Sequence, residues 1–356
     1  MTENVFLISG LYGFDNEAKL DNFIFINVLG SGSFAKVVLV KHRSTRKISA
    51  LKMIKVNPED RPSTESRIMF LLKHQFLTSM AYSFQSMGYI CFVMDFGIGG
   101  DLLFHLITAV NLGGGFSSDR TRFYAAEIAC ALGFLHSNKI LYRDLKLENV
   151  LLDKDGHVKI ADFGLCKDNM LYRARTTSLC GTPEFMAPEA LCINPLQGYG
   201  RAADWWSFGV VVYQMRCGYV PFRGENHDAV LSEVNKGLRF EAGIEEPTQH
   251  LVINLLLKEP DKRLGGGPRD FIDVKNHAFF EPINWDQLSD RSLKPDFAPQ
   301  LKNDTDMKYF DISYLLQPHL PTDHLNEHIR RYKDDELNLI YELFSYHEER
   351  KTDDTS

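Results

Sequence analysis

The sequence lacks the features that mark secreted and membrane-spanning chains. No apolar run approaches the roughly 20 residues that an α-helix needs to cross a bilayer. The 6 cysteines lie far apart, without a C-x-x-C pair or a disulfide-framework spacing. No basic segment followed by an apolar one begins at Met1, so no secretory leader is expected. We therefore expect a reducing, cytoplasmic location, and leave open a nuclear pool or recruitment to a membrane by a module outside this sequence.

The sequence also lacks charge of one sign. Its 40 Lys and Arg and 47 Asp and Glu residues are scattered along the chain and give a formal net charge of -7. No basic run favours nucleic acid or a lipid surface as a partner, so we expect neither. The chain is large enough to bury a substantial core. Its 356 residues, of which 44% are apolar, can form one large domain or two coupled lobes. We expect it to act as a monomer.

The pattern changes along the chain and predicts four segments. Residues 1–22 are weakly patterned and are interpreted as an N-terminal leader. Residues 23–95 carry short β-branched and aromatic runs, which predict a small antiparallel sheet with one helix around Glu65 to Leu72. The predicted strands contain Phe23 to Ile26, Val37 to Val40, Ala50 to Ile54 and Ile90 to Met94.

The second half of the sequence is mainly helical. In residues 96–280, one helix face is predicted by apolar residues at helical spacing, namely Tyr124, Ile128, Ala131, Leu132 and Leu135. The stretch from Asp204 to Cys217 is apolar on nearly every side, which predicts a helix buried in the centre. Residues 281–356 gain proline, lysine and aspartate and predict an extended tail. The expected fold class is α+β, with a small β-sheet lobe and a larger, mainly α lobe.

A glycine-rich run suggests a phosphate-binding loop. Gly30-Ser31-Gly32-Ser33-Phe34-Ala35 fits the G-x-G-x-x-G/A pattern, in which missing side chains let backbone N–H groups approach phosphate oxygens. A dinucleotide-binding fold would need a helix directly after the glycines, whereas Lys36 to Val40 favours a strand. A glycine turn without a ligand is the alternative. Lys52, in a predicted strand, would neutralise phosphate charge if Glu65 on the following helix held it in place.

The segment from Tyr142 to Gly164 carries candidate catalytic residues. If Asp155-Gly156 forms a two-residue hairpin turn, Asn149 faces Asp162, and the two side chains offer oxygen ligands for Mg²⁺. Asp144 would orient an incoming hydroxyl, and Lys146 would stabilise charge on a phosphoryl group in transfer. Arg143 would bind a phosphate on a neighbouring loop. The alternative is an ordinary hairpin with flanking charges in solvent.

Taken in order, these motifs resemble those of the eukaryotic protein kinases. The resemblance covers roughly residues 23–346. It rests on the glycine loop, Lys52, Glu65, Tyr142-Arg143-Asp144 through Asn149, Asp162-Phe163-Gly164, Ala187-Pro188-Glu189, Asp204 and Arg263. Thr182-Pro183-Glu184, Asp204-Trp205-Trp206 and Arg263-Leu264-Gly265 are similar to the AGC group, nearest to protein kinase B, with protein kinase C and the serum- and glucocorticoid-induced kinases as near relatives.

The resemblance implies a serine/threonine protein kinase that uses ATP and Mg²⁺. It implies a hinge at Met94, Asp95 and Gly97, with Met94 as gatekeeper, and a tail that returns to the small lobe. Phe310 or Tyr314 would cover the adenine, and Asp101 would lie beside the ribose. Further nucleotide contacts are implied at Val37, Ala50, Glu148 and Leu151.

The resemblance also implies regulation by phosphorylation and a substrate preference. Ser178, Thr322 and Ser345 are the expected phosphorylation sites, and a phosphate on Ser178 would pair with Arg143 and Lys167. The run from Tyr341 to Tyr346 resembles a hydrophobic motif, on which an upstream activating kinase would dock. Asp101, Glu148 and Thr182 are the expected substrate-binding residues.

Three departures from the kinase pattern affect these expectations. Ala35 replaces the third glycine of the loop, and the segment from Lys52 to Glu65 is short and contains two prolines. A nucleotide-binding scaffold without catalysis is therefore the alternative function. Gln214 stands where basophilic relatives carry a glutamate, so we expect protein substrates with upstream arginine but weaker selectivity at one arginine subsite.

Overall fold

The structure is a computed structural model that describes residues 19–31, 35–55, 72–86, 89–192, 197–311 and 346–347. The chain forms two compact units. The first unit includes residues 78–96 and the chain before residue 74 and after residue 302. The second unit includes residues 74–77 and 97–302.

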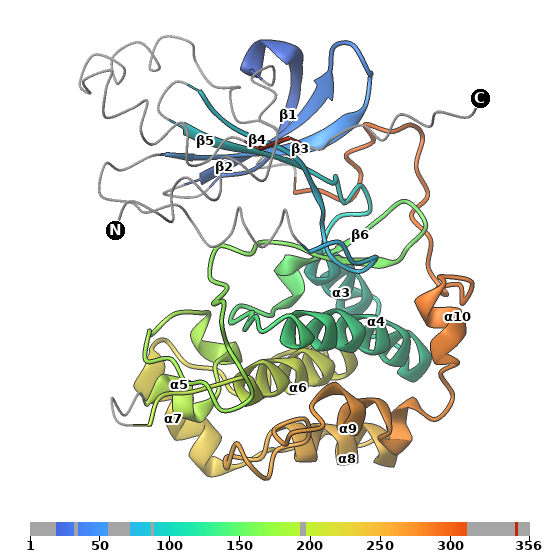
Figure 1. Ribbon diagram of the computed structural model, residues 1–356. Coiled ribbons are helices and arrows are strands. Elements are labelled where there is room, and N and C mark those ends of the chain that lie inside the picture. Colours follow the sequence, from blue (N-terminus) through green and yellow to red (C-terminus); the bar gives the residue numbers. More distant parts are fainter. Residues whose placement is uncertain are drawn as a thin grey trace, which may run out of the picture. The chain divides into compact units, whose positions relative to one another are not determined.

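The first unit is built on an antiparallel sheet (Figure 1). A short 3₁₀ helix, η1 (Leu20–Asn22), leads into it. The strand order is β1-β2-β3-β5-β4-β8, with the bounds β1 (Phe23–Ser31), β2 (Ala35–His42), β3 (Ile48–Lys55), β4 (Met80–Ser86), β5 (Tyr89–Met94) and β8 (Tyr346–His347). All four predicted strands are confirmed. Because β2 begins at Ala35, a strand rather than a helix follows the glycines, which excludes the dinucleotide-binding alternative.

The sheet is stabilised by the alternation of its side chains. Alternate residues in the middle of β2, β3 and β5 point into one apolar core, and the side chains there are at most 1% exposed: Val38, Val40, Leu51, Met53, Cys91 and Val93. Phe23 stacks on Phe84 in the same core, with ring centroids 6.1 Å apart. Burial of this apolar surface favours the sheet over the unfolded chain.

The second unit is mainly helical (Figure 1). Its α-helices are α3 (Leu102–Asn111), α4 (Ser118–Ser137), α5 (Pro188–Leu191), α6 (Ala202–Cys217), α7 (His227–Lys236), α8 (Glu246–Leu255), α9 (Phe271–Lys275) and α10 (Trp285–Ser289). Its 3₁₀ helices are η2 (Leu147–Asn149), η3 (Pro183–Phe185) and η4 (Ala278–Phe280), and its strands are β6 (Val150–Leu152) and β7 (Val158–Ile160).

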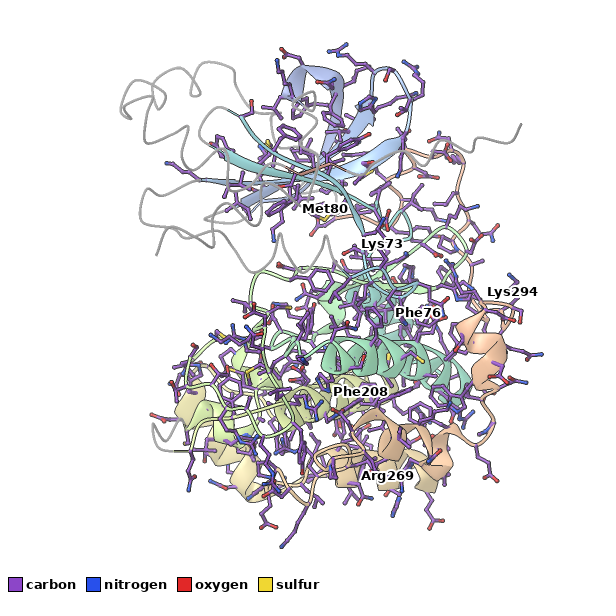
Figure 2. The ribbon with its side chains drawn as sticks, in the orientation of Figure 1. Lys73, Phe76, Met80, Phe208, Arg269 and Lys294 are labelled. Atoms are coloured by element: carbon purple, nitrogen blue, oxygen red, sulfur yellow. The ribbon has the colours of Figure 1, made fainter. Side chains whose placement is uncertain are left out.

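Helices α4 and α6 form the core of this unit, as predicted. The five residues of the predicted α4 stripe are completely buried. Every residue of α6 from Ala203 to Met215 is buried, and Gly218 ends the helix in the left-handed conformation at φ 89°. Figure 2 shows Phe208 of α6 in the interior of this unit, where its side chain is 0% exposed. The α+β fold class is therefore confirmed.

The hairpin of β6 and β7 differs from the prediction by one residue. Leu152 pairs with Val158, and three residues rather than two form the loop beyond the closing pair of Asp153 and His157. Gly156 has φ +88°, which is typical of the last residue of a three-residue loop. The partner of Asn149 is therefore Ala161, whose N–H donates to the Asn149 carbonyl at 2.8 Å. The predicted facing of Asn149 and Asp162 is wrong.

The chain that follows α9 still packs against the second unit. An ideal Cβ on Gly156 would lie 2.0 Å from the carbonyl oxygen of Phe297, so only glycine allows this approach. Arg291 forms an ion pair with Asp153.

Within the described ranges, no helix combines the length and the apolar character that a membrane span requires.

Candidate active site

The central residue of the site is Asp144, which lies in the loop between α4 and β6 and is 8% exposed. Its Oδ1 accepts a hydrogen bond from the Thr182 hydroxyl at 2.9 Å. Its Oδ2 lies 3.0 Å from the Lys146 ammonium, and that ammonium donates to the same Thr182 hydroxyl at 2.9 Å. The three side chains predicted from the sequence are thus brought together. A carboxylate, an ammonium and a hydroxyl within hydrogen-bond reach form an arrangement suited to positioning a hydroxyl group.

Asn149 is held against Asp144 by its amide nitrogen. Nδ2 donates to the Asp144 carbonyl at 2.9 Å and to its Oδ2 at 3.0 Å. Among the described residues, the Asn149 Oδ1 receives no hydrogen bond, although the residue is 8% exposed. An amide oxygen fixed in this way is a suitable ligand for a hard cation.

Asp162 directly follows Ala161, the residue whose N–H donates to the Asn149 carbonyl. It is exposed and has φ +57°, and its Oδ1 accepts the Gly164 N–H at 3.2 Å. The next residue, Phe163, is 1% exposed and packs edge-on against Tyr142 at 5.9 Å. A buried phenylalanine therefore anchors the exposed carboxylate at the open end of the hairpin. Outside the masked residues, no cluster of three or more His, Cys, Asp or Glu side chains could hold a metal ion, so an amide and a carboxylate are the ligands to consider.

The backbone before Asp144 is fixed by Asp204, at the start of the buried helix α6. The two oxygens of Asp204 accept the N–H groups of Tyr142 and Arg143, each at 2.8 Å. Arg143 has φ +73°, an uncommon conformation for a residue with a side chain. The carboxylate therefore stabilises a strained backbone conformation directly before Asp144.

His136 was not predicted from the sequence, yet it connects two carboxylates beneath this loop. Its Nε2 lies 2.8 Å from Asp204 and its Nδ1 lies 2.9 Å from Asp270. Burial would lower the pKa of His136, but hydrogen bonds and charge from Asp204 and Asp270 outweigh it and raise the pKa to about 9. Asp270 also accepts the indole N–H of Trp205 at 2.7 Å. The imidazole is therefore charged at neutral pH.

This charge makes stability depend on pH in a defined direction. The folded-state pKa of His136, about 9, lies above its ordinary value of 6.5. The stabilisation is therefore complete below pH 6.5 and is lost as pH rises through 9. We expect a loss on the order of 3 kcal/mol over this range, measured by urea unfolding. His136→Gln should abolish this component. A difference between the two proteins that stays constant from pH 6 to 10 would contradict the assignment.

The activation segment, defined here as Asp162 to Glu189, approaches Arg143. The Arg143 Nε donates to the Leu165 carbonyl at 2.5 Å, whereas its Nη1 is buried without a hydrogen-bond partner. Lys167 is exposed and pairs through its backbone with Leu141. Ser178 is exposed, and its carbonyl accepts the Tyr199 hydroxyl at 2.7 Å. Both predicted phosphate-binding residues thus belong to the same unit as Ser178.

Two acidic residues at the edge of the second unit influence one another. Asp101 caps α3, and its Oδ1 accepts the Phe104 N–H at 2.8 Å. Burial raises the pKa of Asp101, the hydrogen bond from Phe104 opposes this change, and the negative charge of Glu148 adds to it. Glu148 itself is exposed. A cationic ligand would relieve this repulsion.

Gln214 lies in α6 with an unsatisfied acceptor. The residue is 8% exposed, and its Oε1 is buried without a hydrogen-bond partner. A buried acceptor without a donor is unfavourable, so this oxygen is a candidate partner for a donor group that the described residues do not supply.

The residues expected to bind nucleotide lie in both units. In the first, Gly30 pairs with Val37, Ala50 pairs with Met94, and Lys52 pairs with both Val37 and Phe92 in the sheet. Asp95 accepts the Ser79 hydroxyl at 2.7 Å. Phe310 stacks on Phe96 at 5.5 Å, so the tail does return to this unit at Phe310.

Gly97, the glycine expected in the hinge, belongs to the second unit. An ideal Cβ on Gly97 would lie 2.6 Å from the Leu151 Cβ, so glycine is required there. Leu151 also forms a backbone bridge with Asp101. Several expected residues fall outside the described ranges, namely Gly32, Ser33, Phe34, Glu65, Tyr314, Thr322 and Ser345. Of the hydrophobic motif, only Tyr346 is described, as part of β8, which pairs with Tyr82 and Ser83 of β4.

Comparison with known proteins agrees with this arrangement. The family described as Protein kinase domain matches residues 23–280. A RAC serine/threonine-protein kinase of Drosophila melanogaster is 46% identical over 302 residues, which are 83% of this chain and 48% of the relative. The serine/threonine-protein kinase akt-1 of Caenorhabditis elegans is 43% identical over 310 residues, 85% of this chain and 56% of the relative. The human RAC-beta serine/threonine-protein kinase is 42% identical over 308 residues, 85% of this chain and 63% of the relative.

These relatives confirm the resemblance to the AGC group near protein kinase B, and the bilobal fold expected from it. The chain spans about half to under two thirds of their length, from 48% to 63% for the three relatives named.

Proposed function

The chain belongs to the protein kinase domain family, and we propose that it is a serine/threonine kinase that transfers the γ-phosphoryl group of ATP to hydroxyls of other proteins. The observation that carries this proposal is the binding of the Thr182 hydroxyl by Asp144 and Lys146, each at 2.9 Å. This hydroxyl stands in for the substrate hydroxyl that would bind there. The same two groups would orient the substrate oxygen and take its proton.

In this reaction, each residue of the catalytic loop has a separate task. Asp144 accepts the hydroxyl proton, and its neighbours Asn149 and Lys146 keep its oxygens in place. Lys146 stabilises negative charge on the phosphoryl oxygens. Asp204 holds the loop in its strained conformation, so the reacting groups need no rearrangement.

The donor set fits Mg²⁺ bound to the phosphates of ATP. The free Oδ1 of Asn149 and the exposed carboxylate of Asp162 are the protein ligands we assign to the ion, which would neutralise phosphate charge. We assign Lys52, Gly30 and the rest of the glycine loop to the phosphates. We assign Met94, Asp95, Gly97, Val37, Ala50, Leu151 and Phe310 to the adenine and Asp101 and Glu148 to the ribose. A scaffold function without catalysis is not favoured, because the hydrogen bonds around Asp144 are complete.

We propose substrates with an arginine upstream of the acceptor hydroxyl, because the acidic residues Asp101 and Glu148 would bind its positive charge. Asp101 and Glu148 repel one another, and a guanidinium would relieve this repulsion. Gln214 would bind a second arginine as a neutral acceptor only. Since a hydrogen bond to a charged group contributes about 1.5–3 kcal/mol and a neutral one about 1 kcal/mol, we expect weaker selection at that subsite.

A peptide library tests both the activity and the preference. We expect transfer of radiolabelled γ-phosphate that requires Mg²⁺. One upstream arginine should raise kcat/KM by about 10-fold or more, and a second should raise it by less than 10-fold. Restoring the charge with Gln214→Glu should increase the second effect only. Equal rates for peptides with and without upstream arginine would refute the preference, and no transfer to any hydroxyl would refute the kinase activity.

We further propose that phosphorylation of Ser178 regulates the activity. The buried Nη1 of Arg143 and the exposed Lys167 would receive a phosphate on Ser178, which adds nearly two negative charges and orders the activation segment. Thr322 and Ser345 stay proposed modification sites, and Tyr341 to Tyr346 a proposed docking segment for an upstream kinase. All 6 cysteines are free thiols, which supports the expected reducing, cytoplasmic location.

A further inference from the structure

The exposed side of helix α3 is apolar and carries no charge. No Asp, Glu, Lys or Arg occurs from Leu102 to Phe116. In the helix, Ile107 is 52% exposed and Val110 is 41% exposed, and Leu112, directly after it, is 86% exposed. Surface helices ordinarily carry charged or polar residues on the side away from the core. These three side chains, called here the α3 patch, are therefore suited to contact with another molecule.

The α3 patch lies beside the C-terminal end of α6. An ideal Cβ on Gly218 would lie 2.7 Å from the Val110 Cγ2, so these two residues are in contact. The loop after the patch is also fixed on α6, because a Cβ on Gly115 would lie 2.3 Å from the Arg216 carbonyl oxygen. The N–H of the next residue, Phe116, donates to the Met215 carbonyl at 2.7 Å. The patch therefore has a defined position in the second unit.

The patch is continuous with two residues that the proposed function assigns to substrate arginines. Asp101 caps the first turn of α3, and Val110 lies in the last turn of the same helix. Gln214 lies one turn before Gly218 in α6, and its carbonyl accepts the Gly218 N–H at 2.8 Å. A substrate held by its arginines at Asp101 and Gln214 would therefore have the patch within reach of its N-terminal part.

The length of α3 sets the spacing that such a substrate needs. At a rise of about 1.5 Å per residue, Asp101 and Val110 are separated by about 14 Å along the helix. An extended peptide covers this distance with about four residues. An apolar residue about four positions before the arginine at Asp101 would therefore reach the patch.

Other occupants fit the patch less well. A stable dimer buries about 800 Å² on each partner, which is more than three side chains supply. A lipid surface attracts lysine and arginine, but no basic residue occurs from Leu102 to Phe116. The neighbouring Arg216 donates two hydrogen bonds to Glu245, at 3.0 Å and 2.8 Å. A peptide with one apolar side chain matches both the size and the neutrality of the patch.

We propose that the α3 patch binds an apolar side chain of the protein substrate, N-terminal to the arginine that Asp101 receives. This inference rests on the proposed function and adds an apolar residue to the sequence that the substrate must carry. Binding removes apolar surface of both molecules from water. The contact is remote from the phosphoryl group and is the same before and during transfer. It therefore lowers KM and leaves kcat unchanged.

A peptide series tests the inference on the full chain. Each peptide carries one serine and the upstream arginine, and a single leucine is moved stepwise through a run of alanines N-terminal to the arginine. We measure transfer of radiolabelled γ-phosphate from Mg·ATP. Leucine about four residues before the arginine should lower KM about 10-fold relative to alanine, with kcat unchanged. Ile107→Gln with Leu112→Gln should remove most of this gain and leave the rate with the alanine peptide unchanged.

The matched control replaces two exposed isoleucines elsewhere in the same unit. Ile253 of α8 is 47% exposed and Ile272 of α9 is 51% exposed. Ile253→Gln with Ile272→Gln removes a similar apolar surface and should leave the leucine gain unchanged. Sedimentation velocity and flotation with vesicles of phosphatidylcholine and phosphatidylserine test the other occupants. A dimer, or vesicle binding, that Ile107→Gln with Leu112→Gln abolishes would assign the patch elsewhere and overturn the inference.

The kinetic outcomes separate the inference from the proposed function. Transfer to the arginine peptide without a gain from leucine at any position would overturn the inference and keep the kinase activity. A gain that persists in Ile107→Gln with Leu112→Gln, or that is lost equally in the control variant, would also overturn the inference. If no peptide is phosphorylated, the proposed function fails and the inference fails with it.

Discussion

Asp144→Asn is expected to lower kcat by about 10²- to 10⁴-fold, the usual contribution of a positioned proton acceptor. Asn keeps the shape of the side chain, so the Thr182 hydroxyl retains an oxygen acceptor. The amide group cannot take a proton, and it places N–H groups toward Lys146 and the Asn149 amide, which now both donate to the carboxylate. The loss should therefore appear in kcat with little change in the binding of Mg·ADP. Radiolabelled transfer to peptide, together with calorimetry for the nucleotide, measures the two effects.

The matched control is another aspartate-to-asparagine substitution, placed in the nearby hairpin of β6 and β7. Asp155 is exposed in the turn between β6 and β7, and Asp155→Asn should leave kcat unchanged. Retention of more than a tenth of the activity in Asp144→Asn would show that this carboxylate is not the proton acceptor. A loss of nucleotide binding as large as the loss of kcat would instead assign it a structural role.

Arg263→Ala is expected to destabilise the second unit by about 3–5 kcal/mol, because it leaves a buried charge without its partner. The Arg263 side chain is 0% exposed and forms two parallel hydrogen bonds with Glu189, at 2.7 Å and 2.9 Å. It also donates to the carbonyls of Ala202 and Leu257 and lies over the ring of Trp206. Removing it takes a donor from the Glu189 carboxylate and from the carbonyls of Ala202, Leu257 and Lys258 at once. Chemical denaturation followed by tryptophan fluorescence measures the loss.

The neighbouring Lys262 provides the control. Lys262 pairs with Glu259 on the surface, and both side chains are largely exposed, so Lys262→Ala should not change the denaturation midpoint measurably. The double variant Arg263→Ala with Glu189→Ala should lose less than the sum of the single variants, since neither charge is then left alone. A cost below 1 kcal/mol for Arg263→Ala would refute this account.

Elements with a strong apolar period could be predicted from the sequence. The α4 stripe and the buried helix α6 follow directly from the spacing of their apolar residues, because burial of one face imposes that spacing. Strand β4 was missed, since Met80 to Ser86 mixes polar and apolar residues and includes Ser83, which is 0% exposed. Its position is set by pairing with β5, a tertiary contact that the local pattern does not encode.

The site could be predicted where the order of residues carries the chemistry, and not where it depends on three-dimensional contacts. Asp144 and Lys146 could be named from their order in the sequence, whereas the hydrogen bonds that bring Thr182 to them come from the structure. The hairpin register was wrong by one residue, because loop length depends on the Asp153 side chain, which accepts the N–H groups of Asp155 and His157. His136 was missed because it meets Asp204 and Asp270 from 68 and 134 residues away. A single histidine on a helix gives no sign of either partner.

The approach of Phe297 to Gly156 has a practical consequence for the boundary of the folded unit. The family match ends at residue 280, but Arg120 lies 4.9 Å from the ring of Phe297, and Gln75 donates to the Leu288 carbonyl. A fragment cut at the end of the family match would leave the Arg120 guanidinium without one of its aromatic neighbours and uncover the hairpin below the catalytic loop. Expression fragments of this domain should extend at least to Pro299, whose ring packs close to Gly99.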